Sequence, residues 1–425
     1  MNILVHTWWL SKKLGSEFAV SYNFIKEMSK KHHLYVLVES NSYKWNDLSE
    51  FNGGGYNCMS NVEFITVPYH NKFLEKLCSF IPLGWFSYLL FHGWERGVYS
   101  YIKKSGLLEK IDLIHYAAPV GYREPGFLWK FKKPYVWGPF GGMYRIPGEF
   151  LAEYPAKARI LGRIKNALNF LQFHSRRIKK VLKKSDVLIA CTKTQSRMVN
   201  WLLKKECCRY LPENGIDYEK QQSISEDFLR NKFIKKIVNI IWIGRNDTRK
   251  NARLLCDALK KCKTQNFTCT FVGVNCSKLK MLFDLTKDAA LLSRLEFIEY
   301  VPREEVLEMY KSAHLMAITS SMEANTTVLF EAMENCVPVM TVDHCGMADV
   351  VKDNFTGIKV AVQNLKKMSE DFARKIDEVC AAPEKLLQFA NNIKTNSYEY
   401  SQEYRMNFFE QCYKDAIKNF ARDEK

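Results

Sequence analysis

The sequence lacks apolar runs long enough to cross a bilayer, and it lacks paired cysteine motifs. No uninterrupted apolar stretch reaches the roughly 20 residues that a membrane-spanning helix needs. The 13 cysteines are odd in number, and no two have the C-x-x-C spacing of a zinc or redox site. Residues 1–7 have the pattern of a first strand and not of a signal peptide. These absences predict reduced thiols and a cytoplasmic location.

Acidic residues are missing from residues 157–184, although the whole chain has 46 Asp and Glu beside 63 Lys and Arg, a formal net charge of +17. Apolar residues recur there at helical spacing, which predicts one basic amphipathic helix that docks peripherally on the anionic inner face of the plasma membrane. Residues 73–91, rich in aromatics, are a second predicted membrane contact. Both segments also fit ordinary core-facing helices. The basic residues are Lys157, Arg159, Arg163, Lys165, Arg176, Arg177, Lys179, Lys180, Lys183 and Lys184, and the apolar ones are Ile160, Ile164, Ala167, Leu168, Leu171 and Ile178.

The length of 425 residues exceeds what one core usually supports, so two domains are expected. Short apolar runs alternate with helical patterns along the chain, which predicts an α/β fold with parallel sheets covered by helices on both faces. The predicted strands are 2–7, 34–38, 62–67, 113–116, 135–137, 187–190, 237–243, 268–272, 295–298, 315–319, 337–342 and 357–360.

The strand pattern restarts near residue 237, after a polar stretch that contains an Asn-Gly turn. We therefore predict a first domain at 1–212, a linker at 213–235, a second domain at 236–395 and a C-terminal helix at 396–425. Two doubly wound domains are expected to bind ligands where their strands end, in a cleft between them.

Charged residues follow two predicted strands of the second half. Gly244, Arg245 and Lys250 follow one strand, and fixed cations there suit a diphosphate. Glu323 and Glu331 lie on either side of a predicted helix start, where free N–H groups favour a phosphate. Glu331 has the acceptor capacity for a vicinal diol such as ribose. Taken singly, each motif also fits a solvated surface loop.

In combination these residues resemble the retaining glycosyltransferases of family 4, which have the GT-B fold. The resemblance rests on Gly-Arg followed by Lys-Asn, on the glutamate pair, and on the residues after the second glutamate. Segment 14–17 resembles the family's glycine-containing loop after the first strand. Segments 114–115, 121–126 and 137–142 are similar to a branch whose members often build bacterial surface polysaccharides. Segment 212–217 and the final helix, which crosses back to the first domain in this family, extend the resemblance over nearly the whole chain.

The resemblance implies a role for each matching position. Arg245 and Lys250 would bind the donor diphosphate, and Arg249 would share the role of Lys250. Glu331 would bind the ribose and Glu323 the transferred sugar. His115, or Ala117 as the alternative aligned position, would meet the sugar from the first domain. The remaining predicted donor-binding residues are Gly15, Ser16, Gly244, Thr326, Thr327 and Val328.

The expected activity is a retaining transfer of one sugar from a nucleotide sugar to a glycan or undecaprenyl-linked oligosaccharide, in lipopolysaccharide O-antigen or capsule biosynthesis. No cofactor is expected, and no metal, because an Asp-x-Asp pair is missing near the predicted site. The alternatives are a nucleotide-sugar epimerase of the same fold and a basic nucleic-acid-binding protein, although no nucleic-acid motif accompanies the charge. The sequence sets neither the donor nucleotide nor the oligomeric state.

Overall fold

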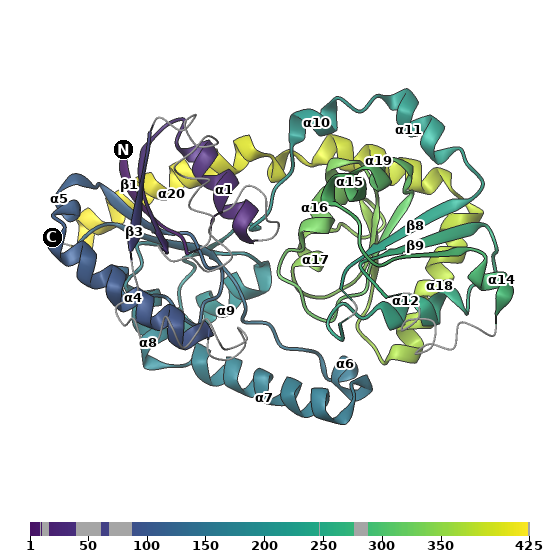
Figure 1. The fold of residues 1–425 in the computed structure, drawn as a ribbon, viewed down its shortest axis with the longest axis horizontal. Helices are drawn as coiled ribbons and strands as arrows, with labels where there is room; N and C mark the ends of the chain where they lie inside the picture. Colours follow the sequence, from purple (N-terminus) through teal and green to yellow (C-terminus); the bar gives the residue numbers. More distant parts are fainter. Residues whose placement is uncertain are drawn as a thin grey trace. The chain divides into compact units, whose positions relative to one another are not determined.

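The computed structural model describes residues 1–8, 10, 17–39, 61–67, 87–245, 247–275 and 288–423, and it divides into two compact units (Figure 1). Unit 1 comprises Met1–Met143, Phe170–Glu213 and Arg405–Lys425, and unit 2 comprises Tyr144–Asn169 and Asn214–Tyr404. The main division falls at residue 213, and residues 405–425 cluster with unit 1. Residues 214–235, predicted as a linker, and Tyr144–Asn169, predicted in the first domain, cluster with unit 2.

Unit 1 is built on a seven-stranded parallel sheet with the order β3-β2-β1-β4-β5-β6-β7. The six strands predicted in this half are confirmed. The seventh, β7, was not predicted, because its three residues form no apolar run. The strands are β1 (Asn2–His6), β2 (His33–Glu39), β3 (Val62–Val67), β4 (Leu113–Tyr116), β5 (Tyr135–Phe140), β6 (Val187–Ala190) and β7 (Cys208–Tyr210).

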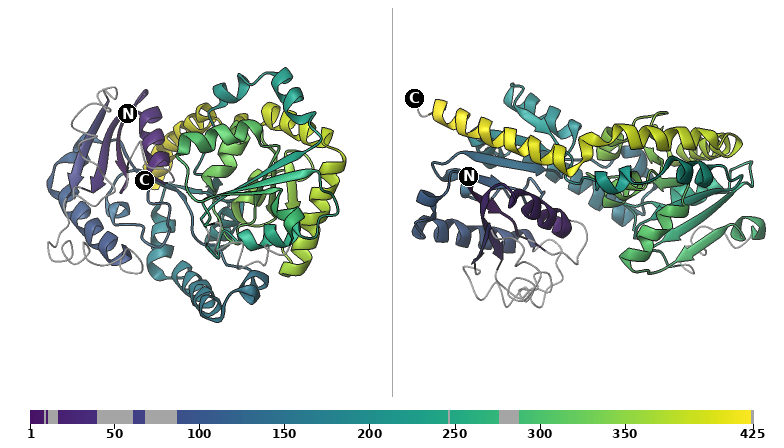
Figure 2. Two further views of the ribbon diagram at one scale, coloured as in Figure 1. Left: turned by 45° about the vertical axis from the view of Figure 1, so that its right-hand side comes forward. Right: turned by 90° about the horizontal axis from the view of Figure 1, so that it is seen from above.

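Alternate residues of these strands face two apolar clusters, one on each side of the sheet. Ile3 and Val5 of β1 pack with Phe409 of α20 on one face, whereas Leu4 packs with Trp94 of α4 on the other. Figure 2 shows α20, in yellow, running along this sheet. The helices are α1 (Glu17–Met28), α4 (Ser87–Lys104), α5 (Leu107–Lys110), α8 (Arg176–Lys184), α9 (Lys193–Leu203) and α20 (Gln402–Asp423), with a 3-10 turn η1 (Leu128–Lys130).

Unit 2 contains a six-stranded parallel sheet with the order β10-β9-β8-β11-β12-β13. All six strands were predicted, within one or two residues at each end. They are β8 (Val238–Ile243), β9 (Phe267–Val272), β10 (Leu295–Ile298), β11 (Leu315–Ile318), β12 (Val339–Val342) and β13 (Gly357–Val360).

Two helical layers cover this sheet (Figure 1). Trp242 of β8 packs in the cluster that contains α12 and α18, and Ile241 packs in the cluster of α15, α16 and α17. Phe150, Leu151 and Tyr154 join the first cluster, which is why their segment belongs to unit 2. The helices are α6 (Gly148–Glu153), α7 (Ala156–Phe173), α10 (Tyr218–Gln222), α11 (Glu226–Phe233), α12 (Ala252–Leu259), α14 (Ala289–Leu292), α15 (Arg303–Ser312), α16 (Thr327–Glu334), α17 (Cys345–Val350), α18 (Leu365–Ala381) and α19 (Glu384–Asn396), with a 3-10 turn η3 (Tyr398–Tyr400).

The prediction of one basic helix over residues 157–184 is wrong, because the segment forms two helices, α7 and α8. The break falls at Ser175, which has extended backbone and caps α8 by accepting a hydrogen bond from the Ile178 N–H. The two helices also differ in packing. The apolar residues of α8 are buried in the unit 1 core, whereas Ile160, Ile164 and Leu171 of α7 are exposed.

The cysteines within the described ranges are free thiols. Among the helices that the structure describes, none combines the length and the apolar character needed to cross a bilayer. Residues 73–86 of the predicted aromatic membrane contact lie outside the described residues.

Candidate functional site

The predicted donor residues gather where β8 and β11 end, the two neighbouring strands at which the strand order of unit 2 reverses. Loops diverge there to the two faces of the sheet, which leaves room for a ligand. The loop after β8 carries Gly244, Arg245, Arg249 and Lys250. The loop after β11 carries Glu323 and leads into α16.

Two cations share the Glu323 carboxylate. Arg249 Nη1 donates to Glu323 Oε1 at 2.6 Å, and Lys250 Nζ lies 2.7 Å from the same oxygen. The Lys250 side chain is only 14% exposed, and its Nζ lies 3.5 Å from Thr326 Oγ1 at the start of α16. The resemblance implied that Arg249 shares the role of Lys250. The structure brings both cations to one carboxylate, and their binding to a diphosphate stays a prediction.

Arg245 is arranged differently from those two cations. Its side chain is 82% exposed and lies 3.7 Å from Asp247, whose Oδ1 accepts a hydrogen bond from the Lys250 N–H at 2.8 Å. Asp247 therefore shapes the turn that places Lys250, while Arg245 extends into solvent from the same turn. Its binding to a diphosphate stays a prediction.

The N-terminus of α16 adjoins this group of charges. Thr326 precedes the helix, and its side chain makes no capping hydrogen bond. The first N–H groups of α16 therefore have no side-chain cap from Thr326, and the Lys250 ammonium lies close to the helix start, 3.5 Å from Thr326 Oγ1. Lys250 and the helix start together form a cationic site of the kind that binds phosphate.

Backbone contacts fix the loop that carries Glu323. Gly346, at the start of α17, donates its N–H to the Glu323 carbonyl at 3.2 Å. A Cβ at Gly346 would lie 1.4 Å from the Ala324 carbonyl oxygen, so only glycine permits this approach. The resemblance had matched Gly346 without explaining its role.

Hydrogen bonds to backbone carbonyls hold Arg249 and Lys250 against the end of β11. The Thr319 hydroxyl donates to the Lys250 carbonyl at 2.9 Å and accepts from Trp242 Nε1 at 2.9 Å. The Ser321 N–H donates to the Arg249 carbonyl at 2.8 Å, and its hydroxyl lies 2.6 Å from the Tyr154 hydroxyl. Sequence reasoning missed these residues, because a buried Trp, Thr or Tyr carries no charge pattern and the partners are far apart in the chain.

Glu331 lies further along α16 and is already paired. Arg303 Nη2 donates to Glu331 Oε1 at 2.8 Å, and the buried Tyr310 hydroxyl donates to Oε2 at 3.3 Å. Burial raises the pKa of Glu331, while Arg303 and the Tyr310 hydrogen bond oppose that rise. The carboxylate is thus a desolvated acceptor that a neighbouring cation stabilises. No pattern in the sequence pointed to Arg303 or Tyr310.

His115 of unit 1 is fully buried at the end of β4. Its Nδ1 lies 2.8 Å from the Tyr413 hydroxyl and its Nε2 lies 2.7 Å from the Gly138 carbonyl. Burial lowers its pKa to about 4, so the ring is neutral near pH 7. Both nitrogens have protein partners, as in a structural histidine, and its contact with a sugar stays a prediction.

A small pocket in unit 1 adjoins His115 and is also lined by Ala117, Ser21, Pro139 and Arg405. Ala117, the alternative aligned position, therefore lies at the carboxyl end of β4 beside open space. Gly15 and Ser16, the predicted glycine-containing loop, lie outside the described residues.

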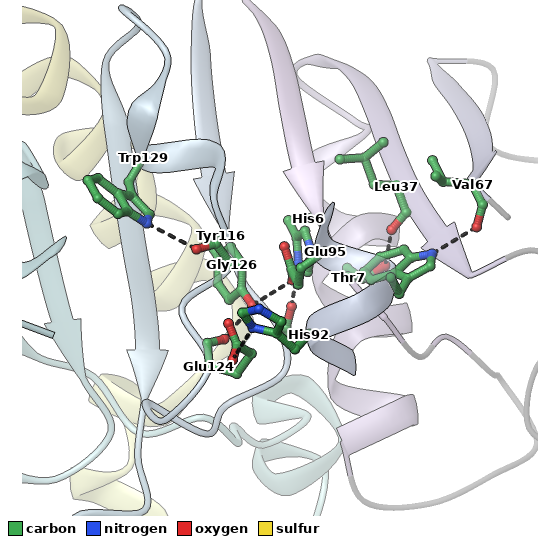
Figure 3. Close-up of polar contacts among 12 residues, drawn as sticks. His6, Thr7, Leu37, Val67, His92, Glu95, Tyr116, Glu124, Gly126 and Trp129 are labelled. Carbon is green, nitrogen blue, oxygen red and sulfur yellow. Dashed lines mark hydrogen bonds and ion pairs between the residues drawn. The ribbon is translucent and has the colours of Figure 1, made fainter. Parts of the chain in front are cut away.

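A buried polar network joins β1, β4 and α4 of unit 1 (Figure 3). His6 Nε2 lies 2.8 Å from Glu95 Oε1, and both side chains are fully buried. The Tyr116 hydroxyl lies 3.0 Å from the same Glu95 oxygen and 2.9 Å from the Glu124 carbonyl. Burial is the main cause that raises the pKa of Tyr116 well above its usual value. This network braces the strand ends of unit 1.

Glu124 extends this network to α8. It lies 3.0 Å from His92 Nδ1 and accepts hydrogen bonds from both terminal nitrogens of Arg177, one of them at 2.9 Å. The Arg177 guanidinium also lies over the Phe127 ring, 4.9 Å from its centroid. Arg177 was predicted to face a membrane, but these contacts give it a structural role within unit 1.

Comparisons with known proteins agree with this fold. Residues 224–396, all within unit 2, match the family model "Glycosyl transferases group 1". The chain is 27% identical over 172 residues to the amylovoran biosynthesis glycosyltransferase AmsD of Erwinia amylovora, which covers 40% of this chain and 46% of AmsD. The alignments span less than half the length of the curated relatives.

Solved structures are similar over nearly the whole chain. Sucrose-phosphate synthase of Thermosynechococcus elongatus matches with a TM-score of 0.67 at 15% identity, covering 98% of this chain and 99% of that one. Anabaena HepE in complex with UDP-glucose matches with a TM-score of 0.54 at 15% identity, covering 100% and 99%. At such identities the likeness establishes the fold, which is GT-B, as predicted.

Proposed function

We propose that this protein is a retaining glycosyltransferase of family 4, which transfers a hexose from a nucleotide sugar to a glycan or lipid-linked oligosaccharide of a bacterial surface polysaccharide. The observation that carries the proposal is the position of Lys250, whose Nζ lies between the Glu323 carboxylate and the start of α16. That position suits an anion that is joined to a hydroxyl-bearing group. A sugar diphosphate has both parts.

In this proposal the donor diphosphate lies at the N-terminus of α16. The N–H groups near Thr327 and Val328 hold its outer phosphate, and Lys250 neutralises its charge. Arg245, which is exposed on the same turn, folds over the bound diphosphate. Glu323 accepts hydrogen bonds from the transferred sugar, and its oxygens are oriented by Arg249.

The chemical step breaks the bond between the anomeric carbon and the diphosphate oxygen while the acceptor hydroxyl forms the new bond on the same face. The acceptor proton moves to the departing phosphate oxygen, so charges and atoms balance without a protein base. Negative charge develops on the leaving diphosphate, and preorganised cations and N–H groups stabilise it most. We propose that these groups suffice without a metal. Full activity in EDTA is the expected result.

The identity of the donor can be tested by measuring the binding of nucleotide sugars. Purified protein is screened by thermal shift against UDP-, GDP-, ADP- and dTDP-sugars, because a ligand that binds only the folded state raises the melting temperature. HepE in complex with UDP-glucose makes UDP-glucose the first donor to test. A shift with one nucleotide class is expected, and no shift with any of them contradicts the proposal.

The reaction class needs a second measurement. With the identified donor and a glycan acceptor, NMR of the early product reports the anomeric configuration. Retention is expected, and inversion contradicts the family 4 assignment. Conversion of the donor without any acceptor would instead indicate a nucleotide-sugar epimerase.

We also propose that α7 docks on the anionic inner face of the plasma membrane, where a lipid-linked acceptor resides. Ile160 is 57% exposed and Leu171 is 64% exposed, with Leu161, Ile164 and Phe170 also exposed on this helix. Lys157, Arg163 and Lys165 accompany them, and the segment contains no acidic residue. Exposed apolar side chains flanked by cations match a surface of acidic headgroups over acyl chains.

Vesicle co-sedimentation tests the docking. Binding to vesicles that contain phosphatidylglycerol is expected, with little binding to pure phosphatidylcholine. The double variant Ile164→Ser, Leu171→Ser should weaken binding about tenfold or more. Both substituted side chains are exposed in the folded protein, so the melting temperature should not fall. Unchanged binding of the double variant excludes α7 as the contact.

A further inference from the structure

Arg303 and Tyr310 contact different oxygens of the Glu331 carboxylate. A carboxylate offers about four lone-pair sites, two on each oxygen. Arg303 takes one site on Oε1, and the Tyr310 hydroxyl, which has one proton, lies 3.3 Å from both Oε2 and the Val328 carbonyl oxygen. At least one site on each carboxylate oxygen therefore remains, which is the number that two adjacent hydroxyls require.

We propose that Arg303 is a positioning residue that holds Glu331 as a two-oxygen acceptor for the 2′- and 3′-hydroxyls, so that the site selects a ribonucleoside diphosphate over its 2′-deoxy form. The inference rests on the proposed donor site and names its nucleotide class. Arg303 acts through Glu331 and needs no contact with the nucleotide. Its side chain is 47% exposed, whereas that of Glu331 is 13% exposed, so the cation reaches the buried carboxylate from the surface.

Among the described neighbours of Glu331, Arg303 is the cation that forms an ion pair with its carboxylate. Tyr310, also from α15, is fully buried, and burial raises its pKa well above the usual value, so it stays a neutral donor. Glu334, on α16 itself, adds negative charge and is paired with Lys220 of α10 at 2.6 Å. Without Arg303, Glu331 would keep one neutral donor, the like charge of Glu334 and the weaker effect of the Lys220 cation. Its protonated form would be favoured, and that form accepts fewer hydrogen bonds.

The test compares affinities of UDP and 2′-deoxy-UDP, or of GDP and 2′-deoxy-GDP if the donor screen selects guanine. In the unaltered protein the ribonucleotide should bind about tenfold or more tightly than the deoxy form, the usual effect of a hydrogen bond to a charged group. In Arg303→Gln the ribonucleotide should bind about tenfold more weakly, whereas the deoxy form, which keeps only the 3′-hydroxyl, should lose less affinity, and Arg303→Lys should restore part of the difference. The loss of ribonucleotide binding on acidification should also begin at a higher pH in Arg303→Gln.

Lys311→Gln is the matched control, because Lys311 lies on the same helix and pairs with Glu308. It should leave the ratio of the two affinities unchanged. An unchanged ratio in Arg303→Gln, or an equal loss for both nucleotides, overturns the inference. Tighter ribonucleotide binding would show that Arg303 competes with the diol, and that also overturns it. If the unaltered protein binds no nucleoside diphosphate, the proposed function itself fails.

Discussion

The ends of the central strands differ between the two units, although both sheets have the same parallel order. In unit 2, the ends of β8 and β11 carry an exposed Arg245 and a partly accessible Lys250 beside an uncapped helix start. In unit 1, the ends of β1 and β4 carry His6 and His115, which are fully buried and bound to protein atoms. The strand ends of unit 2 therefore present accessible charged side chains, whereas the polar side chains at the strand ends of unit 1 are buried and paired with protein atoms.

This difference shows that topology supplies a place for a ligand and that side-chain pairing decides what the place can bind. Polar residues after a parallel strand are not sufficient evidence of a site. At the edge of unit 1, ring nitrogens and carboxylates are matched to each other, so a new ligand would have to break buried contacts. At the edge of unit 2, cationic groups remain reachable, and an anion can join them.

The largest expected effect is a loss of sugar transfer when the cations that follow β8 in unit 2 are removed. Lys250→Ala should lower kcat/KM by about 100-fold to 10,000-fold, because an ammonium that stabilises the leaving diphosphate is lost. Arg245→Ala should act in the same direction, and its exposed side chain predicts little change in stability. Steady-state transfer assays with the identified donor measure both.

Arg253→Ala is the matched control for these variants. Arg253 lies on α12 of the same unit and pairs with Asp257 at 3.3 Å on the surface. It should keep near-normal activity. If Arg245→Ala and Lys250→Ala also transfer sugar at the normal rate, the accessible cations at the strand ends of unit 2 do not contribute to transfer.

The sequence predicted the parts of this contrast that follow from local pattern. Apolar runs identified twelve of the strands. Charged residues after two predicted strands pointed to Lys250 and Glu323, and the following helix pattern pointed to Glu331; their binding of a donor stays a prediction. It did not predict the pairing of Arg303 with Glu331 or the Tyr154 contact with Ser321, because these depend on which elements become neighbours in the folded sheet. It also treated the apolar positions of 157–184 as one face, because periodicity alone does not show the break at Ser175.

The second prediction concerns the buried polar network at the ends of β1 and β4 in unit 1. Glu95→Ala should lower the free energy of unfolding by about 3–5 kcal/mol, because removing one partner of a buried pair leaves His6 without its acceptor. Chemical denaturation measures the loss. The surface variant Glu109→Ala on α5 is a suitable control, since its side chain is exposed. A loss below about 1 kcal/mol in Glu95→Ala would mean that the network of Figure 3 contributes little to the stability of unit 1.

The third prediction concerns how the stability of the protein depends on pH through His115, at the end of β4. Burial lowers the pKa of His115 to about 4, below its unfolded value near 6.5. The unfolded chain therefore binds this proton first, and stability falls as pH drops from about 6.5 toward 4. The shift corresponds to about 2–3 kcal/mol over that range. In His115→Gln this acid-dependent loss should be smaller by that amount when unfolding is measured at several pH values. An unchanged slope would show that His115 is reached by protons in the folded state.

The smallest expected effect compares two lysines within unit 2. Lys232 is buried, donates to the Tyr310 carbonyl at 2.9 Å, and has its pKa lowered by burial to about 8, whereas Lys250 lies at the charged strand edge. Below pH 8 both the folded and the unfolded chain hold the Lys232 proton, and the folded chain bears the cost of burying the charge. Stability should therefore rise by about 2 kcal/mol between pH 7.5 and 9.5 as the folded chain releases this proton first. Lys232→Met should remove that rise and keep transfer activity, which would separate a buried lysine that only supports α15 from the lysine that binds the donor.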